Sequence, residues 1–83
     1  MKNIYNVVSD LEDVFPQYRI VVNCQNPNYM VWFEDKSNSD KFMEVELIIN
    51  EAEESVVTSL LINNNFPIRE YTEILDIFMR KFD

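Results

Sequence analysis

The spacing of hydrophobic residues changes twice along this chain, from three or four positions to two and back again. The longer period predicts a helix over residues 4–15, which Pro16 ends because a proline disfavours helical geometry in the residue before it. The same period returns after Pro67, a residue suited to the first turn of a helix. Its apolar stripe consists of Ile68, Tyr71, Ile74, Leu75, Phe78 and Phe82.

Between these segments, apolar and polar residues alternate in the manner of half-buried strands. The alternation predicts strands over 18–24, 29–35 and 42–49, with a turn at residues 26–28 and a polar loop over 35–41. A fourth segment, 53–62, fits two structures. Its Val-Val-Thr run favours a strand, whereas the spacing of its valines and leucines also suits a helix. We expect a strand here.

These elements predict one α+β domain over residues 1–83, because a chain of this length has room for a single core. The expected order is an N-terminal helix, an antiparallel β-meander of three or four strands, and a C-terminal helix. Each helix has one apolar stripe to bury, so the simplest architecture places both helices on one face of the sheet. The other face is then open.

Charge restricts the class of partner. Fifteen acidic residues outnumber seven lysines and arginines, which gives a net charge of −8. Nucleic-acid phosphates and anionic membranes repel such a chain, so we expect neither as a direct ligand. A basic protein surface is the natural complement, because opposite potentials steer encounter. Acidity that serves only solubility is the alternative.

Residue types argue against catalysis and against cofactors. The chain has no histidine, the commonest general base, and no glycine, which phosphate-binding loops require. Cys24 alternates in phase with apolar residues, so we expect a buried, inert thiol. The spacing of Asp35, Ser37, Ser39 and Glu46 matches part of an EF-hand loop, but Asp40 replaces the glycine of its sharp turn, so we expect no metal site.

Neither a signal peptide nor a membrane span is expected. The residues after Met1 lack the apolar run of a signal peptide, and no stretch approaches the roughly 18 apolar residues of a membrane span. A single cysteine also allows no intramolecular disulfide, which small secreted domains usually need. We therefore expect a cytoplasmic protein.

Most of the negative charge lies in one quarter of the chain. Eight acidic residues face only Lys36 and Lys41 between positions 34 and 54, a net charge of −6 over 21 residues. Within it, Glu44 and Glu46 share one strand face and stand about 7 Å apart, a spacing of the same order as that of DNA phosphates. The eight residues are Glu34, Asp35, Asp40, Glu44, Glu46, Glu51, Glu53 and Glu54.

Trp32 is the candidate anchor residue beside these acids, and its placement depends on the phase of its strand. If Tyr29, Val31 and Phe33 face the core, Trp32 lies on the open face with Glu44 and Glu46, and with the apolar residues Val21, Met30, Phe42 and Ile48. In the opposite phase Trp32 is a core residue. Tryptophan is prominent among residues that dominate protein interfaces.

In size, acidity and element order, together with the absence of histidine and disulfides, the chain resembles small inhibitors encoded by phages and mobile elements. Type II anti-CRISPR proteins and DNA-mimic inhibitors of uracil-DNA glycosylase are examples. The resemblance covers the overall character of the chain and includes no diagnostic motif. It implies a carboxylate surface that occupies the basic nucleic-acid channel of a host enzyme.

The sequence therefore predicts a non-enzymatic inhibitor that presents an acidic surface to a basic site of a partner protein. The alternative is an interaction or chaperone-like domain that dimerises or holds a partner through its open sheet face or edge. The predicted binding residues are Trp32, Glu34, Asp35, Glu44, Glu46, Glu51, Glu53 and Glu54.

Overall fold

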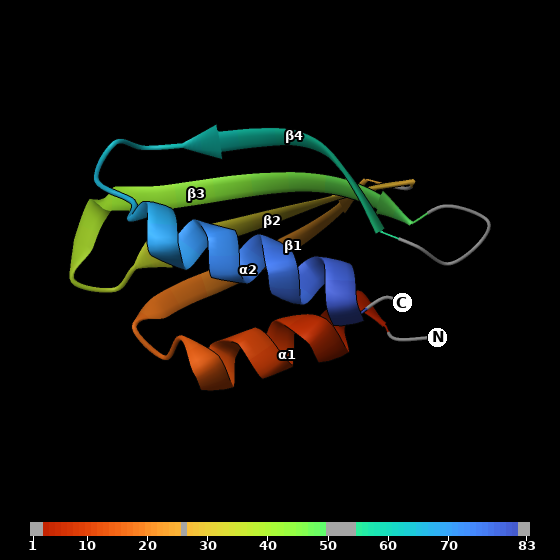
Figure 1. Cartoon of the computed structure of the whole chain (residues 1–83), viewed down its shortest axis with the longest axis horizontal. Helices are drawn as coiled ribbons and strands as arrows, with labels where there is room; N and C mark the ends of the chain where they lie inside the picture. The colour runs from red at the N-terminus through yellow and green to blue at the C-terminus, as the bar shows by residue number, and fades with distance from the viewer. Residues whose placement is uncertain (1–2, 26, 50–54, 82–83) are drawn as a thin grey trace.

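The computed structural model describes residues 3–25, 27–49 and 55–81. Two helices flank four strands in chain order (Figure 1). The elements are α1 (Ile4–Val14), β1 (Tyr18–Gln25), β2 (Asn28–Asp35), β3 (Asn38–Ile49), β4 (Ser55–Ile62) and α2 (Ile68–Lys81). The α+β order predicted from hydrophobic spacing is confirmed.

Helix α1 begins and ends where its flanking residues dictate. The Oδ1 atom of Asn3 accepts a hydrogen bond of 2.8 Å from the backbone N–H of Tyr5 and so caps the first turn. At the other end, the N–H of Phe15 donates to the carbonyl of Leu11 at 2.8 Å, and Pro16 follows directly. The apolar stripe of α1 is buried and consists of Ile4, Val7, Val8 and Leu11.

The four strands form one antiparallel sheet in the order β1-β2-β3-β4, so β1 and β4 are its edges. Residues 55–62 are a strand, as expected in preference to a helix; Glu53 and Glu54 lie outside the described residues. The ladder between β3 and β4 shifts register between Glu46 and Leu47, where Thr58 is the extra residue.

The predicted polar loop over 35–41 is too long. The turn between β2 and β3 contains only Lys36 and Ser37, and β3 begins at Asn38 rather than Phe42. The carboxylate of Asp35 accepts hydrogen bonds from both the backbone N–H and the hydroxyl of Ser37, which closes the chain into an Asx turn. Polar composition indicated a loop, yet exposed polar residues are equally compatible with the end of a strand.

Both helices lie on the same face of the sheet (Figure 1). The core is the layer between them, because alternate residues of the two central strands point toward the helices. Its members from β2, β3 and α2 are Val31, Phe33, Met43, Val45, Leu47, Ile74, Ile77 and Phe78.

Cys24 is exposed, so the expectation of a buried thiol is wrong. Side chains on the helix side of β1 become steadily less buried, from Tyr18 through Ile20 and Val22 to Cys24. Because β1 is an edge strand, its last residues extend past the packed core. Alternation gives the side on which Cys24 lies, but not how far the core reaches.

None of the helices in the described ranges is long and apolar enough to cross a membrane.

Candidate protein-binding surface

The sheet face opposite the helices is the candidate binding surface, called the open face below. Val31 and Phe33 are fully buried in the core, so the strand phase that puts Trp32 on the open face is the correct one. Strand register then places Trp32 opposite Glu44 and Met30 opposite Glu46. The open face includes Arg19, Val21, Asn23, Met30, Trp32, Glu34, Phe42, Glu44, Glu46 and Ile48, and β4 adds Val56, Ser59 and Leu61 beside them.

Trp32 is half-buried and held by two contacts on this face. Its ring stacks on that of Phe42, with centroids 4.9 Å apart and planes 14° from parallel. Its Nε1–H donates a hydrogen bond of 3.2 Å to Glu34 Oε1. Together these contacts hold the indole in one orientation while leaving part of it accessible, as an interface anchor requires.

The three carboxylates of the open face differ in how they are engaged. Glu34 accepts from Trp32 and also pairs with Arg19, whose Nη2 lies 3.3 Å from Glu34 Oε2. Glu46 Oε1 accepts a 2.8 Å hydrogen bond from the Thr58 hydroxyl. Among the described residues, Glu44 has neither a hydrogen-bond nor an ion-pair partner. Its full charge is therefore available to a ligand.

An open hollow of about 430 Å³ lies beside this carboxylate. Glu44 is the single charged residue of its lining, which otherwise includes the Trp32 indole. A cationic side chain fits this combination, because an aromatic ring and a carboxylate both attract a guanidinium or an ammonium group. The lining residues are Val21, Asn23, Gln25, Met30, Trp32 and Glu44.

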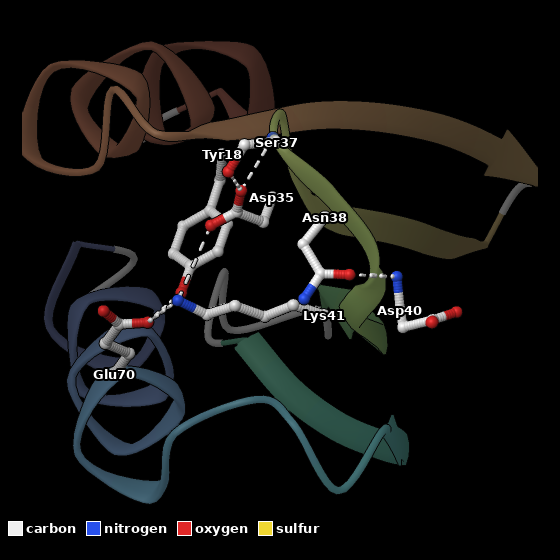
Figure 2. Close-up of polar contacts among 7 residues, drawn as sticks. All are labelled: Tyr18, Asp35, Ser37, Asn38, Asp40, Lys41 and Glu70. Carbon is white, nitrogen blue, oxygen red and sulfur yellow. Dashed lines mark hydrogen bonds and ion pairs between the residues drawn. The ribbon is translucent and has the colours of Figure 1, made fainter.

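Asp35 does not belong to the open face, although the sequence analysis grouped it with Glu34. It pairs in register with the buried Tyr18 and lies on the helix side of the sheet. There the Lys41 ammonium stands 3.6 Å from Asp35 Oδ2 and 3.6 Å from Glu70 Oε2, as Figure 2 shows. These contacts connect the β2–β3 hairpin to α2, so the role of Asp35 is structural.

Tyr18 completes this helix-side cluster. Its hydroxyl donates a hydrogen bond to Glu70, and the Lys41 nitrogen lies 5.1 Å from the centre of its ring (Figure 2). The hydrogen bonds from Ser37 lower the pKa of Asp35, with a smaller contribution from Lys41. Burial raises the pKa of Glu70, and the Glu73 carboxylate adds to that shift.

The remaining predicted acids, Glu51, Glu53 and Glu54, lie outside the described residues. The structure therefore brings together Trp32, Glu34, Glu44 and Glu46 of the predicted set. Sequence reasoning places Phe42 on the same face as Trp32 but did not predict that their rings stack, and it missed Arg19 as the counter-ion of Glu34. Register pairing of neighbouring strands is the signal that could have found both.

No group of three or more potential metal ligands occurs within residues 3–25, 27–49 and 55–81. The EF-hand-like spacing also does not converge in space, because Asp35 lies on the helix side of the sheet and Glu46 on the open face. In the same ranges, no polar or charged residue is buried.

Comparison with known proteins finds no match to this chain among protein-family models, curated proteins or solved structures.

Proposed function

We propose that this chain is a non-enzymatic protein-binding module whose open face occupies a basic site of a partner protein. The observation that carries the proposal is the stacked Trp32–Phe42 pair beside the Glu44 carboxylate, which has no partner in the described part of the chain, on a sheet face that neither helix covers. Exposed apolar area combined with charge of predominantly one sign is typical of interaction surfaces, and on this face three carboxylates accompany Arg19.

The proposed contact is an arginine or lysine of the partner inserted beside Trp32. The cation would lie over the indole and pair with Glu44, while Glu46 attracts a second basic residue one step along β3. Cation–π contacts contribute about 0.5–2 kcal/mol depending on desolvation, and charge-assisted hydrogen bonds add to them. The net charge of −8 brings a basic partner to this face faster than diffusion alone.

In its most specific form, the proposal is that of an inhibitor. Basic sites with closely spaced cations are characteristic of proteins that bind nucleic-acid phosphates. Glu44 and Glu46, about 7 Å apart on one strand face, would take the place of successive phosphates in such a site. The chain would then compete with nucleic acid in the cytoplasm for one binding channel, as DNA-mimic and anti-CRISPR inhibitors from phages do.

Charge reversal on the open face tests the proposal. Proteins captured from a cell lysate by the immobilised wild-type chain should be lost from a Glu44→Lys/Glu46→Lys variant, as measured by mass spectrometry of the bound fraction. A Glu12→Lys/Asp13→Lys variant has the same net charge but changes exposed residues of α1, so it should retain those proteins. Equal loss from both variants, or loss from neither, would refute docking through the open face.

A second candidate function gives the apolar residues of this face the main role. Two of its three carboxylates are already engaged within the molecule, Glu34 with Arg19 and Glu46 with Thr58. A chaperone-like or adaptor domain would hold an apolar segment against Trp32 and Phe42. Its complexes should resist added salt and should be lost on Trp32→Ala substitution, while Glu44→Lys/Glu46→Lys leaves them intact.

A further inference from the structure

The edge strand β4 has no charged residue, in a chain whose net charge is −8. Edge strands usually carry charges or prolines that prevent pairing with another strand. Here Ser55–Ile62 has neither and exposes 43% of Val56 and 55% of Leu61. The bulge at Thr58 lies in the middle of the strand. Apart from this bulge, which is itself a feature that protects edge strands, Ser55–Ile62 has nothing that prevents pairing with another strand.

One flank of α2 continues the apolar surface. Ile68 is 71% exposed and Met79 is 53% exposed, and between them a groove of about 310 Å³ runs past Tyr71 and Leu75. The acid beside the groove, Asp76, is paired with Arg80 at 3.0 Å, so its charge is compensated.

This flank lies toward β4. The opposite side of α2 carries Glu70, which is bound to Tyr18 of β1, whereas the α2 carbonyl of Phe78 accepts a hydrogen bond from Ser55 of β4. Five of the eight large hydrophobic residues that are exposed in the described ranges lie on β4 or on this flank: Val56, Leu60, Leu61, Ile68 and Met79. Together they form one apolar edge of the molecule.

We infer that a second copy of the chain covers this edge by pairing β4 antiparallel with its own β4. A two-fold axis between Thr58 and Ser59 places Val56 opposite Leu61 of the second copy, and Val57 opposite Leu60. The pairing joins two four-stranded sheets into one continuous sheet and brings the two α2 helices together over it. Pairing of β4 with itself is isologous, so it closes as a dimer.

The bulge makes this register self-consistent. Val56 and Leu61 both lie on the open face, since they pair with Ile48 and Glu44 of β3, respectively. Val57 and Leu60 both point to the helix side, opposite Leu47 and Val45. In a regular strand, Val56 and Leu61 would point to opposite faces, because they are an odd number of positions apart, and they could not lie opposite each other in the dimer. The extra residue Thr58 puts both on the same face.

Charge favours a second copy at this edge over one at the acidic open face. Two chains of −8 repel wherever carboxylates meet, but the pairing strand contributes none. Among the residues that the structure describes, the nearest carboxylates of the open face are on β3. Three strand spacings put the two β3 strands roughly 14 Å apart, beyond the Debye length of about 8 Å at physiological salt.

Mass in solution tests the dimer. Light scattering of the full chain should give twice its mass of 10.0 kDa. Leu61→Lys, at an exposed position, should give the monomer mass with an unchanged circular dichroism spectrum. Val14→Lys is the matched control, because Val14 is 52% exposed on α1, and it should stay dimeric. A monomeric wild-type chain, or a dimeric Leu61→Lys variant, would overturn the inference.

Disulfide trapping tests the register. In a Cys24→Ser background, a mixture of Val56→Cys and Leu61→Cys chains should form a covalent dimer on oxidation, because opposed Cα atoms stand about 4.5–5.5 Å apart, within disulfide range. Either variant alone should not cross-link. Cross-linking of one variant with itself, or none in the mixture, contradicts the register. The dimer stands apart from docking on the open face, because Leu60→Lys, at an exposed position on the helix side of β4, should also give the monomer mass yet still capture the partners that Glu44→Lys/Glu46→Lys loses.

Discussion

Asp35 and Glu70 both lie 3.6 Å from the Lys41 ammonium, yet their pKa values shift in opposite directions. The hydrogen bonds from Ser37 stabilise the charged form of Asp35 and lower its pKa. Glu70 loses hydration as it packs beside Tyr18 and also faces Glu73, so its pKa rises despite the nearby cation. The pKa of each carboxyl group therefore depends more on its own hydrogen bonds and burial than on the Lys41 ammonium that both groups share.

These shifts predict opposite pH dependences of stability. Asp35 contributes stability that is present above its ordinary pKa of 3.8 and is lost as pH falls through its lowered value. Glu70 contributes stability that is present below its ordinary pKa of 4.5 and is lost as pH rises through its raised pKa in the folded protein. Relative to wild type, Glu70→Gln should therefore gain stability as pH rises from acid to neutral, and Asp35→Asn should lose it.

Urea unfolding midpoints measured across this pH range check both variants. Each amide keeps an oxygen that accepts the native hydrogen bonds, from Ser37 or from Tyr18. The two variants thus differ from wild type mainly in charge. Parallel pH profiles for the two variants would show that the helix-side cluster does not govern these ionisations.

At the scale of elements, local signals set the ends of α1 and the turn between β2 and β3. Side chains of Asn3 and Asp35 accept backbone N–H groups two residues ahead, at 2.8 Å in each case. Such residues are favoured at helix starts and turns because their short side chains replace missing backbone acceptors. Asparagine and aspartate thus perform turn functions in a chain that has no glycine.

Loss of the α1 cap should lower stability measurably. Asn3→Ala leaves the N–H of Tyr5 without its side-chain acceptor and should reduce the free energy of unfolding by about 1 kcal/mol. Asn3→Asp keeps the acceptor and adds a negative charge at the positive end of the helix, so it should match or exceed wild type. Denaturant titration of the three proteins distinguishes capping from a general effect of substitution at this position.

At the scale of the whole molecule, acidic and apolar surfaces are separated. Glu34, Glu44 and Glu46 accompany Trp32 on the open face, whereas β4 and one flank of α2 form an apolar edge, beside which Asp76 is paired with Arg80. A dimer formed through that edge would place both open faces on the same side of one sheet. Two docking surfaces would then act together, and avidity would strengthen the proposed binding without new contacts.

Salt should affect the two proposed associations in opposite directions. Added salt screens attraction between the open face and a basic partner, so that affinity should fall. The same screening reduces repulsion between two chains of −8 and should strengthen the dimer. Sedimentation at low and high sodium chloride concentration, with and without a captured partner, measures both. A dimer that dissociates as salt rises would indicate an ionic interface in place of the apolar edge.

Much of the open face could be predicted from the sequence, because alternation along a strand is a local property. Alternation groups Trp32, Glu44 and Glu46 on one face, and the burial of Val31 and Phe33 then decides that this face is the open one. Alternation should also have separated Asp35 from Glu34, since adjacent strand residues point to opposite faces. Asp35 and Glu34 are neighbours in the chain, yet they lie on opposite faces of the sheet.

The sequence by itself determined the element order, the apolar stripes and which residues of a strand share a face, because periods of 3.6 and 2 need only neighbouring residues. Tertiary structure alone decided the exposure of Cys24, the Lys41 bridge to Glu70 and the meeting of β4 with the flank of α2. Tyr18 and Glu70 are 52 positions apart, and no local pattern encodes such a contact. The contact between Tyr18 and Glu70 depends on where α2 lies over the sheet, and the packing of the whole core sets that position.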